Sequence, residues 1–120
     1  MIRYEFIVAA LLLGTSVAWS GTMDSTFNNT VVSTDSKGAA SDWFFNPDGT
    51  YTVSVAGKAA GAGHWKLSGG NICSTPDPVT GQPAPAETCV AYIDGKTVGD
   101  SWTTSDAKGG TFTVSIKAGR

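Results

Sequence analysis

The sequence predicts an all-β fold of about eight short antiparallel strands in meander order, closed into an up-and-down barrel that carries one disulfide. Three observations support this prediction. The chain holds 15 glycines with many Thr and Ser residues, a composition that disfavours helices. Turn signals recur about every eight to twelve residues, and apolar and polar residues alternate between them. A β-sandwich is the alternative, but a closed barrel leaves no strand edge unpaired.

The clearest strand is Thr50–Ala56, where Tyr51, Val53 and Val55 alternate with hydroxyl residues. The segment Asn46-Pro47-Asp48-Gly49 precedes it. Proline at the second position and glycine at the fourth are typical of a β-turn. We therefore predict a hairpin between this strand and the one before it.

The last predicted strand places Phe112, Val114 and Ile116 on one face. Gly57–Ala62 is predicted to be a loose Gly/Ala loop, because small residues pack poorly in a strand. No helix is predicted between any two strands. The predicted strands, in order, are 27–34, 42–46, 50–56, 63–67, 72–75, 88–93, 98–104 and 111–117.

Cys73 and Cys89 enclose a segment that holds four of the five prolines. Proline lacks a backbone donor, so this segment is predicted to be a projecting loop, residues 74–88, that a disulfide anchors to the barrel. Such a disulfide contributes on the order of 3 kcal/mol to stability. The cysteine spacing fits no redox or zinc motif, so neither a metal nor a cofactor is expected. The residues of this loop that are candidates for an interaction are Pro76, Asp77, Pro78, Pro83 and Pro85.

Residues 1–20 have the pattern of a signal peptide. Arg3 precedes the apolar run Ile7–Leu13, and Ala18 and Ser20 fit the small residues before a cleavage site. The apolar run is shorter than the roughly 20 residues that span a bilayer. We therefore predict export to the periplasm or the medium, where a disulfide is stable, and no membrane association after cleavage.

The remaining residues, 21–120, are predicted to form a single, monomeric domain. The formal net charge is −2, and removal of Arg3 and Glu5 with the signal peptide leaves it unchanged. The charges are scattered, with no basic run to follow a phosphate backbone. Nucleic acid is therefore not expected as a partner.

Four aromatic residues are candidates for ligand contact if they point into the barrel: Trp43, Tyr51, Trp65 and Trp102. Aromatic rings stack on flat or apolar ligands. The alternative is that these rings fill the interior. An eight-stranded barrel is compatible with either, since its interior holds packed side chains or one small ligand.

Asp100 and His64 are the two residues that could take part in proton transfer. Strict alternation from Val98 to Trp102 places Asp100 on the apolar face, where an unpaired carboxylate is costly. Asp100 is thus a possible buried acid, unless a bulge at Gly99 turns it outward or a structural hydrogen bond holds it. His64, the single histidine, is predicted to face away from Trp65 into solvent. The chain is not predicted to be an enzyme.

Several short motifs occur in a fixed order along the chain. They are Asn29-Thr30, Trp43-x-Phe45, Asp48-Gly49-Thr50-Tyr51, Gly63-x-Trp65, Cys73, Cys89, Gly99-Asp100-x-Trp102 and Gly119-Arg120. This order resembles small exported proteins of unknown function from Gram-negative bacteria. In outline the chain is also similar to lipocalin-like periplasmic protease inhibitors, which implies an exported eight-stranded barrel with one disulfide.

Two functions are therefore predicted. The first is a non-catalytic binding protein that holds a small apolar or aromatic ligand inside the barrel. The second is a protein-interaction module, such as an inhibitor of a periplasmic protease or cell-wall enzyme, that acts through the loop 74–88. A hollow interior favours the first function, and a filled interior with an exposed, rigid loop favours the second.

Overall fold

The computed structural model of the protein describes residues 21–120. Within them the chain forms one short helix, α2 (Thr22–Thr26), and eight strands. The predicted signal peptide, residues 1–20, lies outside the described residues. The strands are β1 (Thr30–Asp35), β2 (Ala40–Phe45), β3 (Thr50–Val55), β4 (Lys58–Ser68), β5 (Asn71–Pro76), β6 (Thr88–Ala91), β7 (Ser101–Ser105) and β8 (Thr111–Lys117).

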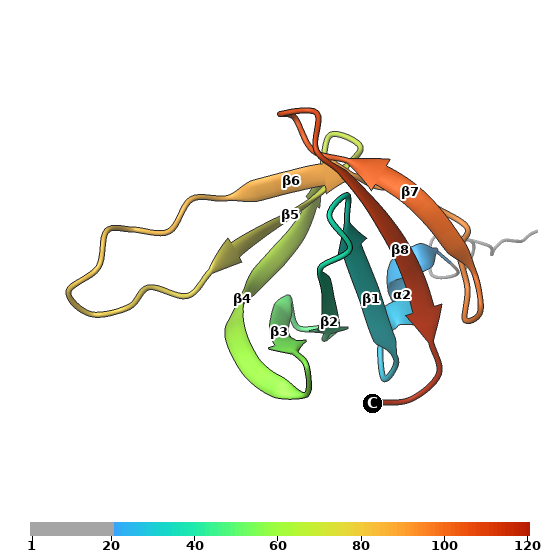
Figure 1. The fold of residues 1–120 in the computed structure, drawn as a ribbon, viewed down its shortest axis with the longest axis horizontal. Helices are drawn as coiled ribbons and strands as arrows, with labels where there is room; N and C mark the ends of the chain where they lie inside the picture. Colours follow the sequence, from blue (N-terminus) through green and yellow to red (C-terminus); the bar gives the residue numbers. More distant parts are fainter. Residues whose placement is uncertain (1–20) are drawn as a thin grey trace, which may run out of the picture.

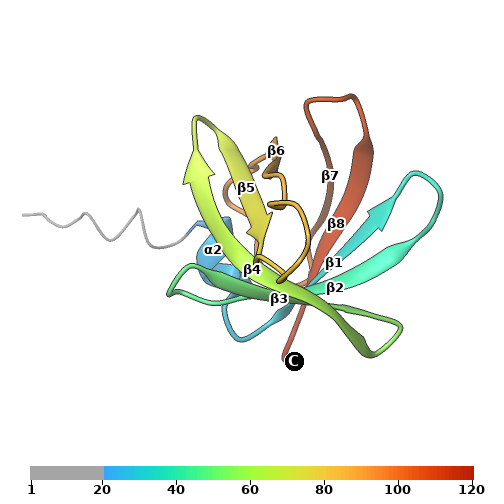
Figure 2. The same cartoon turned by 90° about the vertical axis from the view of Figure 1, so that its left-hand side faces the viewer.

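The described strands form one antiparallel sheet in the order β6-β5-β4-β3-β2-β1-β8-β7, curled into a nearly closed barrel (Figure 2). The predicted meander order is confirmed. The strands form a barrel, as predicted, and not the alternative β-sandwich. A seam remains between β6 and β7. A single bridge, Val90 to Asp106, crosses it, and the Thr104 hydroxyl donates a hydrogen bond to the Ala91 carbonyl oxygen.

The turn between β2 and β3 forms as predicted. The Gly49 amide donates to the Asn46 carbonyl oxygen at 3.1 Å, and Gly49 has a φ of 90°, which glycine adopts without strain. The Asp48 carboxylate accepts hydrogen bonds from the hydroxyl and the amide of Thr50 at 2.6 and 3.0 Å. These two bonds, the hydroxyl first, lower the pKa of Asp48, so the turn is held by an ionised side chain.

The predicted loop at Gly57–Ala62 is wrong. Val55 pairs directly with Lys58, so Ala56 and Gly57 alone form the turn, and the Gly/Ala segment belongs to the 11-residue strand β4. The register shifts between Val53 and Ser54, where β4 accommodates an extra residue. The ladder with β3 holds this segment, and the Ala62 carbonyl oxygen also accepts a hydrogen bond from the Asp77 amide. Such backbone bonds do not depend on side-chain size.

The β3–β4 turn offers a stabilising substitution. Ala56 and Gly57 have φ values of 52° and 79°, the pattern of a type I′ turn. Alanine is strained at positive φ, whereas Asn-Gly is the preferred pair. We expect Ala56→Asn to raise the free energy of unfolding by about 1 kcal/mol in urea melts. Ala59→Asn, in the strand that follows, is the control, and an equal gain there would contradict this explanation.

The predicted boundaries of other strands also shift, most clearly at the start of β1, the end of β6 and the start of β7. The first strand is predicted to begin at Phe27, but residues 27–29 form a turn after α2 and the strand begins at Thr30. Asn28 has a φ of 63°, and the Asn29 side chain donates to the Ser25 carbonyl oxygen at 2.7 Å. These local bonds compete with strand pairing. β6 ends at Ala91 rather than at residue 93, and β7 begins at residue 101 rather than at 98.

The barrel has two different ends. At the closed end lie α2, the β2–β3 turn and the β6–β7 connection, and the buried side chains of Thr22, Met23 and Thr26 face the interior. At the open end lie the hairpin turns β1–β2, β3–β4 and β7–β8 and the β5–β6 loop. This loop, residues 77–87, is called the arm, and it projects from the side of the barrel opposite α2 (Figure 1).

Candidate functional site

An apolar cavity of about 170 Å³ lies inside the barrel. All described strands except β3 and β4 contribute to its walls, and α2 forms its floor at the closed end. The inner face of each contributing strand supplies alternate residues, as the period of two requires. Representative wall residues are Val31, Trp43, Ile72, Val90, Trp102 and Phe112.

Of the four predicted ligand-contact residues, Trp43 and Trp102 line this cavity. The Trp43 indole N–H donates to the Ser41 hydroxyl at 2.9 Å, which fixes the ring. The Lys96 ammonium lies 5.8 Å from the centre of the Trp102 ring, within reach of a cation–π interaction. These contacts fix the indole rings of Trp43 and Trp102, and both rings present an aromatic surface to the interior.

Tyr51 and Trp65 support the walls without lining the cavity. Tyr51 is 3% exposed and stacks on Trp43, with ring centres 5.0 Å apart. Burial raises the pKa of Tyr51, and a hydrogen bond with Ser74 opposes that shift. Trp65 donates from its indole nitrogen to the Asn46 carbonyl oxygen at 3.0 Å and packs edge-on against Phe45.

Sequence reasoning did not name several lining residues. Alternation places Phe112 and Val114 on one face of the last strand, and this pattern could have identified both as lining residues. Ile72 and Val90 pair across β5 and β6 and both face the cavity, which required the register. Met23 belongs to a helix that the sequence pattern did not reveal.

Three of the hydroxyl groups that line the cavity are already bonded within the protein. Thr22 donates to the Ile93 carbonyl oxygen at 2.6 Å, and Thr26 donates to the Met23 carbonyl oxygen at 2.7 Å. Thr104 donates to the Ala91 carbonyl oxygen, as described for the seam. These protons are therefore not available to a ligand.

Tyr92 and Asp94 hold α2 in place. The Met23 amide donates to the Tyr92 hydroxyl oxygen at 3.1 Å, and the Tyr92 hydroxyl lies 3.3 Å from a carboxylate oxygen of Asp94. The same carboxylate accepts from the Thr22 amide at 3.1 Å. This bond is the main cause of a lowered Asp94 pKa, whereas burial raises the pKa of Tyr92.

The Asp94 contact makes α2 sensitive to acid. A carboxylate whose pKa is lower in the folded state stabilises that state above its ordinary pKa of 3.8, and this contribution is lost as the pH falls through the folded value. We expect Asp94→Asn to lower stability near neutral pH and to reduce the further loss between about pH 5 and about pH 2, because the amide keeps an acceptor but no charge. Urea midpoints across this range measure both effects, and parallel acid profiles would contradict the assignment.

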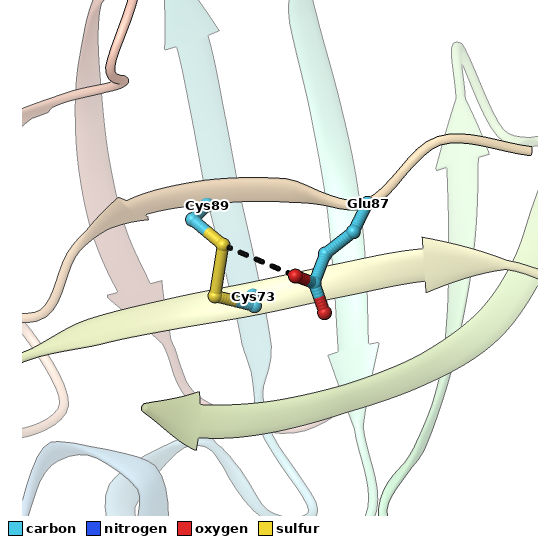
Figure 3. A group of neighbouring side chains, drawn as sticks. All are labelled: Cys73, Glu87 and Cys89. Atoms are coloured by element: carbon cyan, nitrogen blue, oxygen red, sulfur yellow. Dashed lines mark hydrogen bonds between the residues drawn. A yellow bond between two sulfur atoms is a disulfide. The ribbon is translucent and has the colours of Figure 1, made fainter. Parts of the chain in front are cut away.

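The predicted disulfide joins Cys73 to Cys89 and lies within the β5–β6 ladder, where the two residues are direct partners (Figure 3). Cys73 is 4% exposed. A Glu87 carboxylate oxygen lies 3.7 Å from the Cys89 sulfur, and Lys66 pairs with Glu87 at 3.4 Å. The two cysteines and Glu87 are close enough to share a metal ion, but the bonded sulfurs are not thiolates and cannot ligate as such.

The arm begins later than the predicted loop 74–88, because the ladder continues past the disulfide to Ser74 and Thr88. Its base is held by the Asp77 amide, which donates to the Ala62 carbonyl oxygen at 2.9 Å, and by the His64–Asp77 pair at 3.2 Å. A turn at its tip places Val79 63% exposed. Of the predicted interaction residues, Pro76 ends β5, Asp77, Pro78 and Pro83 are exposed on the arm, and Pro85 is half-buried.

Asp100 is half-buried rather than buried, and it precedes β7. Gly99 has a φ of 95°, and the Asp100 carboxylate accepts a hydrogen bond from the Thr97 amide at 3.0 Å. The carboxylate thus stabilises a turn, in agreement with the alternative that a structural hydrogen bond holds Asp100. His64 is exposed on the outer face of β4, at the base of the arm.

No helix in the described part of the chain has the length and apolar character needed to cross a bilayer. Comparison of the sequence with models of protein families and with curated proteins, and of the structure with solved structures, gives no match.

Proposed function

We propose that the protein is an exported, non-catalytic binding protein that holds a small apolar or aromatic ligand inside the barrel. The observation that carries this proposal is the cavity of about 170 Å³ with its predominantly apolar walls. An interior filled by side chains would leave no such volume. The disulfide Cys73–Cys89 is compatible with export, because it persists in oxidising compartments.

The size of the cavity limits the ligand. An engineered apolar cavity of roughly 150 Å³ in another protein binds benzene, so a single six-membered ring is the appropriate scale. Trp43 and Trp102 offer ring faces, and Met23 at the floor supplies a flexible thioether that adapts to shape. Binding follows from burial of apolar surface in a site that is already formed.

Titration with toluene tests the proposal, with two-dimensional ¹H–¹⁵N NMR as the readout. We expect saturable shifts of the amides of Val114 and Trp102. Val114→Phe, which adds a ring to the cavity, should weaken toluene binding at least about tenfold. Thr113→Phe, on the exposed outer face of the same strand, is the matched control and should bind toluene normally. Unchanged spectra for the folded wild type, or equal binding by both variants, would overturn the proposal.

The arm supports a second candidate function, inhibition of an exported protease. Val79 is the most exposed of the large apolar side chains in the described region, and the disulfide and the proline residues limit the freedom of the segment that presents it. A stiff loop loses little entropy on binding. This candidate predicts inhibition of a serine protease with a small apolar specificity pocket, such as elastase.

Inhibition assays with elastase test this candidate. We expect Val79→Asp to abolish inhibition and Val98→Asp, at another exposed valine far from the arm in sequence, to leave it unchanged. Lack of inhibition by the wild type, or equal inhibition by both variants, excludes elastase-type inhibition through Val79.

A further inference from the structure

We propose that the ligand is an uncharged compound of one aromatic ring that carries a hydroxyl group, bound with the ring against α2 and the hydroxyl at the open end. This inference rests on the proposed binding function and names the ligand class for the same cavity. Two features of the cavity support it: the absence of charged side chains from its walls and the uneven distribution of its polar groups.

The described residues that line the cavity include no Asp, Glu, Lys, Arg or His. Tyr92 is a titratable lining residue that is neutral near pH 7, and burial raises its pKa further. A charged ligand would therefore lose its hydration without gaining a partner of opposite charge, which is strongly unfavourable. A neutral ligand avoids this cost.

The polar groups change in character along the barrel axis. At the closed end, the hydroxyls of Thr22 and Thr26 donate to backbone carbonyl oxygens. The Thr104 hydroxyl, which lies nearer the β7–β8 turn, is likewise bonded to the Ala91 carbonyl oxygen. The Trp43 indole and the Tyr92 hydroxyl also bond within the protein. Because these groups already have partners, the closed end acts as an apolar surface toward a ligand. Such a surface suits an aromatic ring.

The remaining hydroxyls that line the cavity lie toward the open end. Thr88 is the first residue of β6, next to the arm, and Ser33 lies two residues before the end of β1. Neither side chain is hydrogen-bonded to another described residue, whereas Ser74, opposite Thr88, bonds with Tyr51. Ser33 and Thr88 thus provide donors and acceptors where a ligand hydroxyl would emerge.

Three probes of similar size separate the possibilities: p-cresol, toluene and 4-methylbenzoate, titrated at pH 7 with the same NMR readout. A phenol with a pKa near 10 is neutral at this pH, and a benzoate is ionised. We expect p-cresol to bind about fivefold more tightly than toluene, the contribution of one net hydrogen bond. We expect 4-methylbenzoate to bind at least about 100-fold more weakly than p-cresol.

The double variant Ser33→Ala/Thr88→Val identifies the hydroxyls. It should remove the preference for p-cresol and leave toluene affinity nearly unchanged, which also shows that the barrel is intact. Thr113→Val, which removes an outward hydroxyl from β8, should keep the preference.

The outcomes distinguish the two proposals. Binding of 4-methylbenzoate as tight as that of p-cresol, or a preference for p-cresol that survives the double variant, would overturn this inference and leave the proposed function standing. Absence of binding for all three probes would overturn the proposed function itself.

Discussion

Replacement of Gly63 by alanine is expected to destabilise the barrel by about 3 kcal/mol or to prevent folding. Gly63 is buried in β4. A Cβ atom there would lie 2.7 Å from the Tyr51 hydroxyl oxygen and would clash with the Thr75 backbone carbonyl oxygen. The carbonyl belongs to the neighbouring strand and cannot rotate away, so the β4–β5 ladder would have to separate. Urea unfolding followed by circular dichroism measures the loss.

Gly61→Ala is the matched control. Gly61 lies two residues earlier in the same strand, and a Cβ atom there would meet nothing within 4 Å. Alanine in a strand costs less backbone entropy than glycine, so we expect no loss and a gain of up to about 1 kcal/mol. Equal destabilisation by the two substitutions would show that the clash at Gly63 is not the cause.

Reduction of the disulfide is the second change with a large expected effect. The bond closes a loop with a sequence separation of 16, which corresponds to about 3 kcal/mol of unfolding free energy. β6 is an edge strand, held by its ladder with β5 and by one bridge across the seam. We therefore expect a lower urea midpoint with dithiothreitol, together with faster amide exchange in β6.

The double variant Cys73→Ala/Cys89→Ala provides the control for reductant. It should be as unstable as the reduced wild type, and its midpoint should not respond to dithiothreitol. A wild-type midpoint that is the same with and without reductant would contradict the stabilising role of this bond.

Local sequence signals predicted the fold wherever turn chemistry and alternation agreed. Asn46-Pro47-Asp48-Gly49 forms its turn because proline, aspartate and glycine each satisfy a backbone requirement there. The Gly/Ala segment of β4 could not be predicted in this way. Its strand conformation depends on pairing with β3, and its residues carry no alternation to reveal this.

The candidate site was predictable only in part. Trp43 and Trp102 line the cavity as the barrel hypothesis requires, but Trp65 packs against Phe27 and Phe45 outside it, a position that alternation along β4 does not specify. The floor formed by α2 had no sequence signal. A five-residue helix is too short for periodicity, and its position depends on Tyr92 and Asp94, about 70 residues away.

The strand order also has a consequence for how the chain folds. Within the described residues, each ladder joins strands that are consecutive in sequence, except the one between β1 and β8, which pairs Thr30 with Lys117. The hairpins need only short loops to close, whereas the β1–β8 ladder must bring together the two ends of the domain. We expect the hairpins to form early and this ladder to set the folding rate, so that substitutions in β8 slow refolding more than equally destabilising substitutions in β3.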